Sequence, residues 1–459
     1  MSLPNSNRSR IQTETEGAMK CLIIAAGKGH RLRSKGDSKP LIPIFGVPLI
    51  ERVIRSAMET GVNEFYVVIG HQHNLVRDFL EQLAKRLAIR ITPLVNDDWE
   101  KENGLSVLKA RDCLREPFLL LMADHLFDPS IVRKLIELPL ADGEIALGVD
   151  GNRSNPLIDL EDVTRVKTEG GKIRDIGKNM KEYNGFDTGL FVCTPAIFDA
   201  LERCAEETGD TSLSGTVRRL ATRGRANAVD INGYFWIDVD DPEAFQRAEN
   251  ALLDNLRGKT NDGPVARFLN RPLSIRISRR LINYSITPNQ ISLYSFLFSI
   301  LAAGLIALGG YPALFLGGVL AQFASVIDGC DGEIARLKFQ SSDYGKWLDA
   351  VLDRYADAFL LFGLTWHAYS ERTESVVLFI GFMAIIGSFM LSYTADKYDR
   401  LMSHQIRQGK GLLRLGRDVR IFIIFLGAIF HLPFWTLTGI AILMNFETVR
   451  RIVLCRDHG

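Results

Sequence analysis

The sequence predicts a soluble, Rossmann-like α/β domain followed by an all-α domain of six transmembrane helices. Three observations support this prediction. The chain has 459 residues, too many for one ordinary hydrophobic core, so at least two domains are expected. Residues 19–250 contain short apolar runs separated by helical stretches, which is typical of an α/β fold. Residues 281–327 contain no Asp, Glu, Lys or Arg, and no membrane-length apolar run precedes them.

The average composition excludes several classes of protein. The chain has 55 Lys and Arg against 54 Asp and Glu, a net charge of +1 and a mean hydropathy of +0.05. These values exclude a disordered or collagen-like chain. A nucleic-acid-binding protein would normally be basic, so no nucleic-acid partner is expected. The six cysteines are scattered without a CxxC pair, so neither a disulfide framework nor a zinc site is indicated.

Five short apolar runs between residues 19 and 250 are predicted to be buried strands. A helical stretch at 49–61 separates the first run from the second. Residues 1–18 are polar and lack periodicity, so we expect a disordered tail, and residues 251–263 form the predicted linker. The five runs are KCLIIAAG (20–27), FYVVIG (65–70), FLLLMAD (118–124), EIALGV (144–149) and GLFVC (189–193).

The membrane domain is predicted to span residues 284–459. The uncharged run 281–327 would be about 70 Å long as a helix, enough for two crossings, and Gly309, Gly310 and Pro312 supply a turn near its middle. Further apolar runs occur at 375–395 and at 421–446, the latter broken by Pro433, and residues 349–369 are largely apolar. About six membrane-spanning helices are therefore expected.

Basic residues predict the orientation in the cell membrane. They cluster between the expected fourth and fifth helices and after the sixth, so the positive-inside rule places the N-terminal domain and the C-terminus in the cytoplasm. Residues 264–283 mix Arg with apolar residues and predict an amphipathic helix on the membrane surface. A plain basic linker is the alternative for this segment.

A glycine-rich segment follows the first predicted strand. Within residues 25–50, Gly27 and Gly29 allow backbone N–H groups to approach phosphates, and Arg31 and Lys39 add positive charge. A glycine-rich loop alone is weak support for nucleotide binding. The continuation SKPLIPIFGVPLI (38–50) makes the whole segment resemble the signature of the nucleoside-triphosphate transferase family, the sugar-phosphate nucleotidyltransferases.

This resemblance implies a nucleotidyl transfer site. VNDDWEKENGLSVLKA (95–110) is similar to the segment near the base and ribose in family members that use CTP and small phosphoalcohols. Asp124 corresponds to a Mg²⁺ ligand, and either Asp238 or Asp240 supplies the second metal contact. Lys39 is the expected catalytic lysine, and Lys178, with residues 187–189, lies on the acceptor-phosphate side. The implied nucleotide-binding residues are Ala25, Ala26, Gly27, Gly29, Arg31, Asn103, Gly104 and Ser106.

The chemistry of such a site follows from charge. A phosphomonoester oxygen attacks the α-phosphorus of the nucleotide, and pyrophosphate leaves. Because both reactants are anionic, the site must align them and neutralise their charge, which divalent cations and basic side chains do together. Any one of these Asp or Lys residues alone would more often be a solvated surface residue; their combination in this order favours a site.

Four carboxylates lie at the predicted membrane edge. Two are at the end of the second predicted membrane helix, and two are at the start of the third. Asp328 and Asp331 are spaced i, i+3, and Asp349 and Asp353 are spaced i, i+4, so each pair shares a helix face. Carboxylates at a membrane edge are unfavourable unless they are paired or bound to metal. Four converging carboxylates predict a site for hard divalent cations such as Mg²⁺, Mn²⁺ or Ca²⁺. The alternative is that they only cap helix ends.

The spacing D-G-x2-A-R-x8-G-x3-D-x3-D over residues 331–353 resembles the CDP-alcohol phosphotransferase signature. The resemblance implies that Asp328, Asp331 and Asp349 hold metal on the CDP diphosphate. Asp353 would contact metal and act as the general base for the acceptor hydroxyl. Asp357 extends the row but lies outside the signature. The implied nucleotide-side residues are Pro288, Asn289, Gly332 and Arg336.

Basic residues near the fourth and fifth membrane helices are candidates for an acceptor phosphate. Arg417 and Arg420 share a helix face, as phosphate binding requires. Lys397 and Arg400, in SYTADKYDR (392–400), also lie where family members carry basic residues for an acceptor phosphate, although this stretch departs from the commoner family pattern. Ordinary positive-inside charge is the alternative, particularly for Arg400.

The two halves form a coherent pair, because one would make a CDP-activated alcohol and the other would consume it. The combination is similar to the bifunctional enzymes of thermophile osmolyte synthesis. It implies CTP, inositol-1-phosphate and CDP-inositol as substrates, Mg²⁺ or alternatively Mn²⁺ as cofactor, and a homodimer through the membrane domain. One alternative is the same chemistry in phospholipid synthesis. Another is a membrane protein whose soluble half only senses a nucleotide.

Overall fold

The computed structural model describes residues 19–258, 263–401 and 416–456. It divides the chain into two compact units, Met1–Asn250 and Ala251–Gly459, which are considered separately below. The predicted tail, 1–18, lies outside the described residues, as do residues 259–262 of the predicted linker.

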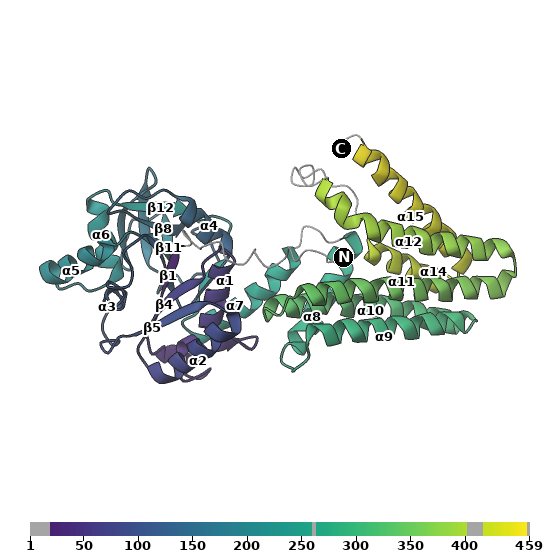
Figure 1. Cartoon of the computed structure of the whole chain (residues 1–459), viewed down its shortest axis with the longest axis horizontal. Helices are drawn as coiled ribbons and strands as arrows, with labels where there is room; N and C mark the ends of the chain where they lie inside the picture. The colour runs from purple at the N-terminus through teal and green to yellow at the C-terminus, as the bar shows by residue number, and fades with distance from the viewer. Residues whose placement is uncertain (1–18, 259–262, 402–415, 457–459) are drawn as a thin grey trace, which may run out of the picture. The chain divides into compact units, whose positions relative to one another are not determined.

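The first unit is built on a nine-stranded mixed sheet (Figure 1). The strand order is β5-β4-β1-β6-β11-β8-β12-β10-β9. All five predicted strands are present, and the predicted helix at 49–61 is α1. The strands of this sheet are β1 (Lys20–Ala25), β4 (Glu64–Ile69), β5 (Arg90–Val95), β6 (Phe118–Met122), β8 (Ile145–Asp150), β9 (Arg165–Glu169), β10 (Lys172–Gly177), β11 (Gly185–Cys193) and β12 (Ala226–Asp230). Two short antiparallel pairs lie outside it: the hairpin of β2 (Pro43–Ile44) with β3 (Val47–Pro48), and the pair of β7 (His125–Phe127) with the distant β13 (Trp236–Asp238).

The parallel part of the sheet determines where a site can form. Strand β1 pairs in parallel with β4 and β6, with Ile23 opposite Val67 and Leu121. Their carboxyl ends therefore meet at one edge, and in open α/β sheets this edge is where ligands bind. The glycine-rich loop follows β1 and Asp124 follows β6, so both reach this edge.

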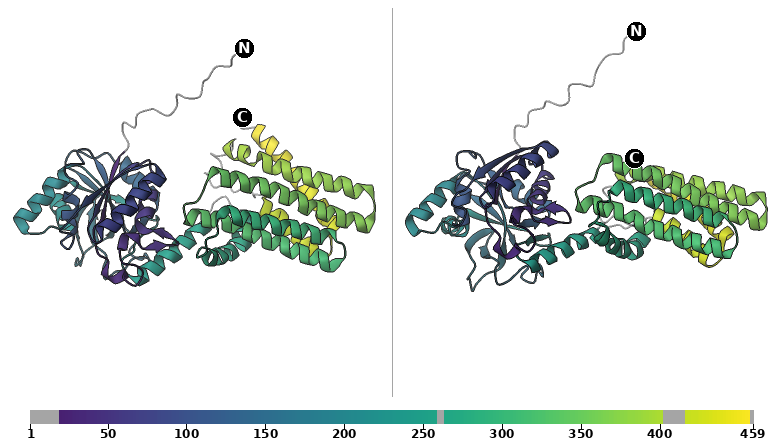
Figure 2. Two further views of the ribbon diagram at one scale, coloured as in Figure 1. Left: turned by 60° about the horizontal axis from the view of Figure 1, so that its bottom comes forward. Right: turned by 90° about the horizontal axis from the view of Figure 1, so that it is seen from below.

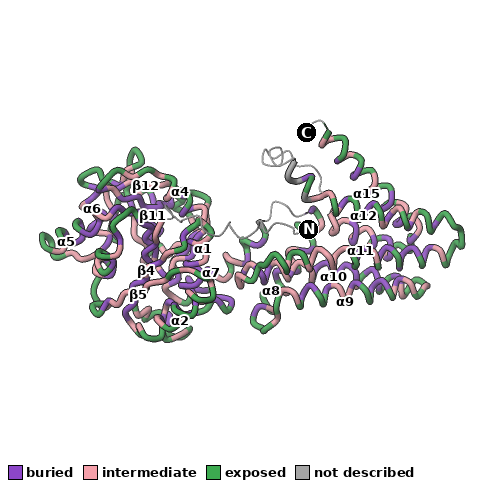
Figure 3. Tube along the Cα trace, viewed as in Figure 1, coloured by how far each residue is buried: buried purple, intermediate pink, exposed green. Residues whose placement is uncertain are grey.

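Helices cover both faces of the sheet. Because side chains alternate along a strand, Ile23 packs in the cluster that contains Ile50 and Leu80, whereas Leu22 packs in the one that contains Leu201 and Val217. Burial is concentrated in the central strands, as Figure 3 shows. The helices of this unit are α1 (Leu49–Met58), α2 (His73–Leu87), α3 (Asn103–Leu108), α4 (Pro129–Glu137), α5 (Ala196–Thr208), α6 (Leu213–Thr222) and α7 (Pro242–Asp254, which runs past the unit boundary).

The second unit is helical, and its long helices run alongside one another in both views of Figure 2. A short helical segment, Ala266–Asn270, leads into α8, so the segment predicted as a surface helix is helical here. The described helices are α8 (Arg271–Leu281), α9 (Pro288–Ala307), α10 (Tyr311–Leu337), α11 (Asp343–Arg372), α12 (Ser375–Leu401), α14 (Arg417–Ile429) and α15 (Pro433–Arg456).

Turn residues end the helices where the sequence predicts. Gly309 and Gly310 separate α9 from α10 with φ angles of 86° and 76°, a backbone conformation that favours glycine. Pro312 belongs to the first turn of α10, and Pro433 begins α15. Proline is tolerated in a first turn because its missing N–H would have no intrahelical partner there.

Three described helical segments are long and apolar enough to cross a membrane: Pro288–Ala307, Tyr311–Leu337 and Ser375–Ala395. Large apolar side chains also remain exposed on this unit; for example, Phe379 is 63% exposed and Ile442 is 65% exposed. Extensive exposed apolar surface of this kind marks contact with a membrane or a partner. The second unit is therefore a membrane-associated helical domain, and the expected number of six spans stays a prediction.

Candidate active sites

The glycine-rich loop positions Lys39 in the first unit. Gly29 has a φ angle of 63°, and a Cβ atom there would lie 2.5 Å from the Cβ of Lys39. A larger residue at position 29 would therefore displace the lysine. Pro40 follows Lys39 in a short 3₁₀ turn and is buried, which fixes the backbone beneath the lysine.

Lys39 forms an ion pair with Asp124, which follows β6, and this pair lies beside His125 of β7 and Asp238 of β13. The ammonium nitrogen of Lys39 lies 2.5 Å from Oδ2 of Asp124. Nδ1 of His125 lies 2.9 Å from Oδ1 of the same carboxylate, and its Nε2 lies 3.9 Å from Oδ2 of Asp238. The pairing of β7 with β13 sets His125 directly opposite Asp238. The ligand atoms of Asp124, His125 and Asp238 all lie within 4.8 Å of one another.

Charge interactions outweigh burial in this group. Burial would lower the pKa of Lys39, but the negative charges of Asp124 and Asp238 and the hydrogen bond to Asp124 raise it overall. Burial likewise opposes a charge on His125, but Asp238 and Asp124 raise its pKa to about 9. The pKa of Asp124 is held well below its usual range, because Lys39 and His125 overcome the effect of burial. All three groups are therefore charged at neutral pH.

A second ionic cluster lies at the same edge. Asp162 accepts hydrogen bonds from Arg31 at 2.6 Å and from Lys178 at 2.5 Å, and these bonds lower its pKa. Arg31 also donates to Asp240, whose pKa is raised to about 7 by burial and by repulsion from Asp238. The geometry thus groups Asp238 with Asp124, and groups Asp240 with Arg31.

A pocket of about 410 Å³ joins these groups to the predicted nucleotide segment. Asn103 and Ser106 line it from α3. Asn103 accepts a hydrogen bond from the backbone N–H of Leu213 at 3.0 Å, and a Cβ at Gly104 would overlap the carbonyl oxygen of Thr211. The segment therefore packs tightly beside the pocket. Further predicted residues that line it are Ala26, Gly27, Arg31, Lys39, Asp124, Lys178, Asp238 and Asp240.

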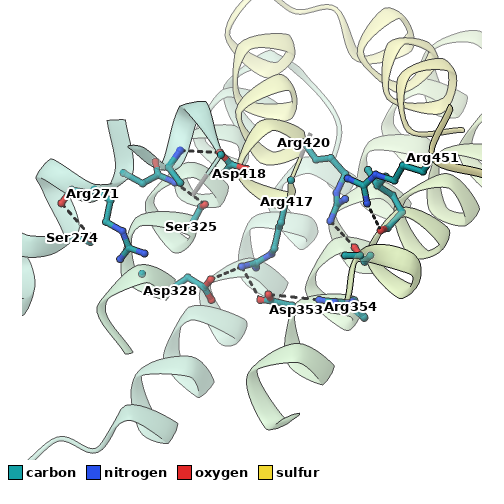
Figure 4. A pocket seen from close by; sticks show the side chains of 18 residues that line it. Arg271, Ser274, Ser325, Asp328, Asp353, Arg354, Arg417, Asp418, Arg420 and Arg451 are labelled. Atoms are coloured by element: carbon teal, nitrogen blue, oxygen red, sulfur yellow. Dashed lines mark hydrogen bonds and ion pairs between the residues drawn. The ribbon is translucent and has the colours of Figure 1, made fainter. Parts of the chain in front are cut away.

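In the second unit, α10 and α11 bring the predicted carboxylates together. Oxygen atoms of Asp328, Asp349 and Asp353 all lie within 4.8 Å of one another. Nη1 of Arg417 lies 2.8 Å from Asp328 and 2.8 Å from Asp353, so its guanidinium bridges two of the three carboxylates. Figure 4 shows this arrangement, with Arg417 pointing toward both carboxylates.

Asp331 stands beside the three-carboxylate group. It accepts hydrogen bonds from Ser292 at 2.5 Å and from the backbone N–H of Gly332. Ser295, one turn further along α9, donates to Asp328 at 3.1 Å. Hydroxyl groups of α9 therefore orient the first pair of predicted carboxylates.

The predicted nucleotide-side residues lie at the beginning of α9 and the end of α10. Thr287 caps α9 through a hydrogen bond to Gln290, which places Pro288 and Asn289 in the first turn. A Cβ at Gly345 would lie 3.0 Å from Oδ1 of Asn289, so this glycine allows α11 to approach α9. Among the described residues, a Cβ at Gly332 would meet no atom within 4 Å outside its chain neighbours and its own helix backbone. Arg336 is half-buried one turn after Gly332.

A pocket of about 370 Å³ adjoins the carboxylates and is rich in arginine (Figure 4). Arg417 and Arg420 both line it, as the prediction of an acceptor-phosphate site requires, but Arg420 also donates to the buried Asp357 at 2.5 Å. Lys397 does not line this pocket; its ammonium lies 3.2 Å from the hydroxyl of Tyr393 on the same helix. The side chain of Arg400 lies outside the described residues.

Several residues of both sites were not predicted. His125 follows Asp124 directly in the sequence. Its position beside a predicted metal ligand could have identified it as a further residue of the site. Asp162 carries no motif, and only the fold brings it to Arg31. In the second unit, Arg271 and Arg451 line the arginine-rich pocket from opposite ends of the membrane domain sequence, where the sequence alone indicated only surface charge.

The residues present fit divalent cations in both units. Oδ1 of Asp238 is buried and accepts no hydrogen bond from the described residues, so its lone pairs are available to a cation. In the second unit, oxygen atoms of three carboxylates lie within 4.8 Å of one another, and two of these carboxylates, Asp328 and Asp353, contact the guanidinium of Arg417. Carboxylate oxygen is the ligand type that hard divalent cations prefer.

Comparisons with known proteins assign a family to each unit. Residues 21–223 match the MobA-like NTP transferase domain, and residues 285–449 match the CDP-alcohol phosphatidyltransferase family. The inositol-1-phosphate CTP transferase from T. maritima has a solved structure that is 29% identical, covering 50% of this chain and 95% of its own, with a TM-score of 0.46.

Relatives also match across both units. The Bifunctional IPC transferase and DIPP synthase of Rubrobacter xylanophilus is 38% identical and aligns over 94% of this chain and 95% of its own length. The protein of the same name from Aquifex aeolicus is 32% identical and aligns over 94% of this chain and 97% of its own length. These alignments cover both units of the chain, and the chain belongs to the family of bifunctional IPC transferases and DIPP synthases.

Proposed function

We propose that the chain catalyses two successive reactions. The first unit converts CTP and inositol-1-phosphate into CDP-inositol and diphosphate. The second unit transfers phosphoinositol from CDP-inositol to an inositol phosphate, giving phosphorylated di-myo-inositol phosphate and CMP. One observation carries the proposal: each unit has its own acidic cluster beside a pocket, in a chain that aligns almost end to end with bifunctional relatives.

In the first unit, Lys39 is proposed to stabilise the charge that develops on the α-phosphate. Its high pKa and 12% exposed side chain support this role, because a buried, charged ammonium is pre-organised for an anion. The glycine-rich loop and α3 would bind CTP, and Lys178 would contact the acceptor phosphate. Arg31, held by Asp162 and Asp240, would face the phosphates.

In the second unit, Asp353 is proposed to accept the proton of the acceptor hydroxyl. Its carboxylate adjoins the arginine-rich pocket, where Arg417 and Arg420 would bind the acceptor phosphate. When the acceptor phosphate binds, Arg417 would exchange part of its contact with Asp353 for the new anion. Lys397, which does not line the pocket, is not needed for this arrangement.

Mg²⁺ is the proposed cofactor of both units. Asp124 and Asp238 would hold it in the first unit, and Asp328, Asp349 and Asp353, with Asp331 beside them, in the second. When bound, it would neutralise phosphate charge and orient the diphosphate for in-line displacement.

The membrane arrangement is also proposed. Helices α9–α12, α14 and α15 would make six crossings, with the first unit and the C-terminus in the cytoplasm. A homodimer through the membrane domain would cover part of its exposed apolar surface. Both reactions would then take place on the cytoplasmic side, where the carboxylate ends of α10 and α11 lie in this arrangement.

Separating the two reactions by mutation tests the proposal. Asp353→Asn should abolish CMP release and leave diphosphate release intact, so that CDP-inositol accumulates. Asp124→Asn should lower diphosphate release by about 10²–10³-fold and leave CMP release from added CDP-inositol unchanged. Both variants are assayed in detergent free of added lipid.

Three results would contradict the proposal. CMP release by Asp353→Asn would remove that residue from the base role. Absence of diphosphate release by the unmodified chain would indicate a nucleotide sensor. Turnover that requires a lipid substrate would favour phospholipid synthesis.

A further inference from the structure

Three potential metal ligands meet at the far end of α11 from the catalytic carboxylates. His367 and Glu371 are spaced i, i+4 on α11, and His431 lies between α14 and α15. Nε2 of His367 lies 3.3 Å from Oε1 of Glu371, and Nε2 of His431 lies 3.2 Å from the same oxygen. His367 follows Asp353 by fourteen residues along α11, or about 21 Å, so this group is separate from the proposed active site.

The protonation of His367 can be assigned from its surroundings. Its Nδ1 lies 2.9 Å from the backbone carbonyl oxygen of Ile306, which can only accept a hydrogen bond, so Nδ1 carries a proton. In the neutral imidazole, the lone pair of Nε2 then faces the carboxylate of Glu371. Nε2 is buried and forms no hydrogen bond to any described residue, and the side chain is 0% exposed.

A lone pair that faces a carboxylate oxygen is unfavourable unless a cation lies between them. The described residues include no lysine or arginine that forms an ion pair with Glu371. The neighbouring Arg372 lies over the ring of Phe434, 4.2 Å from its centroid. A bound cation or a proton therefore has to satisfy this group, because no other positively charged side chain among the described residues forms an ion pair with Glu371.

We propose that His367, Glu371 and His431 bind one transition-metal ion, with Zn²⁺ as the best match. Two imidazoles and one carboxylate are a ligand set that Zn²⁺ prefers, whereas Mg²⁺ and Ca²⁺ prefer oxygen ligands. The hydrogen bond from Nδ1 of His367 to a backbone carbonyl is the outer-sphere contact that usually fixes a metal-binding imidazole. This site is independent of the proposed function.

The ion would fasten the end of α11 to the connection between α14 and α15. Glu371 is 41% exposed and His431 is 47% exposed at the side chain, so an ion can enter from solvent. The ring of Tyr311 lies 5.2 Å from that of His431, and its hydroxyl donates to the carbonyl of Ile429 at 3.0 Å. The first turn of α10 therefore supports the imidazole.

Zn²⁺ binding to the purified full chain tests this proposal. Excess Mg²⁺ is present throughout to occupy the catalytic carboxylates, and Zn²⁺ is titrated against a competing chelating dye. We expect each chain to bind one Zn²⁺ at His367, Glu371 and His431, in addition to any Zn²⁺ that binds at other sites. Both His431→Gln and Glu371→Gln change exposed side chains and should weaken that binding by at least about tenfold.

His73→Gln, a substitution at the start of α2 in the first unit, is the matched control and should bind Zn²⁺ like the unmodified chain. Co²⁺ provides a second readout, because nitrogen-ligated Co²⁺ of low coordination number absorbs visible light strongly. That absorption should disappear in His431→Gln and persist in His73→Gln. Two results would overturn the proposal: equal Zn²⁺ affinity in the unmodified chain and all three variants, or no Zn²⁺ bound in the presence of Mg²⁺. A proton shared by the imidazoles and Glu371 would then satisfy the group.

Discussion

Arg417→Gln should tighten metal binding in the second unit while slowing phosphotransfer. The guanidinium of Arg417 contacts Asp328 and Asp353 at 2.8 Å each, and its Nε lies 3.3 Å from Asp357. A divalent cation held by the same carboxylates must share them with this positive charge. Removing the charge therefore removes a competitor of the metal.

The size of the effect follows from Coulomb's law. Two unit charges about 4 Å apart interact by about 4 kcal/mol at an effective dielectric constant of about 20. The Arg417 side chain is 13% exposed, so screening by water is limited, but the freed carboxylates would repel one another. We therefore expect a net gain of about 1.4–2.8 kcal/mol, which is a ten- to hundredfold tighter metal affinity.

Mn²⁺ binding followed by electron paramagnetic resonance measures this affinity. The chain also carries Asp124→Asn, so that binding in the first unit is weakened. Arg354→Gln is the matched control, because Arg354 lies 3.9 Å from Asp353 and should change the affinity less than about threefold. CMP release by Arg417→Gln should fall by at least about tenfold through loss of the acceptor-phosphate contact. Unchanged or weaker Mn²⁺ binding by Arg417→Gln would refute the reasoning.

Two further predictions concern the first unit. Burial raises the pKa of Asp187 to about 6, so the folded state binds its proton more tightly than the unfolded state and stability falls as the pH rises from about 4 to 6. Asp187→Asn should therefore stabilise this unit by up to about 3 kcal/mol above pH 6 and not at about pH 4, measured by thermal unfolding; equal shifts at both values would contradict this. Gly104→Ala would drive a Cβ into the carbonyl of Thr211 and should raise KM for CTP by at least about tenfold, whereas Gly304→Ala, with open space around the new atom, should not.

Local patterns were sufficient to predict the class of each unit and five of the nine strands of the sheet. The run KCLIIAAG gives β1 because alternate residues can face two separate cores, and Gly309 with Gly310 separates α9 from α10. The antiparallel β11, between β6 and β8, could not be predicted, because strand direction depends on how distant segments pair. The number of membrane crossings could not be predicted with the same certainty: α14 has 13 residues, or about 20 Å, which is shorter than the roughly 30 Å hydrocarbon core of a bilayer.

The residues of the two sites also divide into those that could be predicted from local sequence and those that could not. Residues fixed by helical spacing, such as Asp349 and Asp353, could be placed on one face from the sequence. Residues that meet only through the tertiary fold could not: Asp162 reaches Arg31 across 131 positions of the chain. Spacing also left Asp238 and Asp240 equivalent, whereas the register of β13 against β7 sets Asp238 opposite His125.

The central claim is that one chain both makes and consumes a CDP-activated inositol. Its most direct test is ³¹P NMR of the purified full chain incubated with CTP, inositol-1-phosphate and Mg²⁺ in detergent. The proposal predicts diphosphate, transient CDP-inositol, and then CMP together with a phosphodiester that also carries a phosphomonoester. A spectrum in which CTP is consumed without a phosphodiester product, or in which no CDP-inositol forms at all, would contradict it.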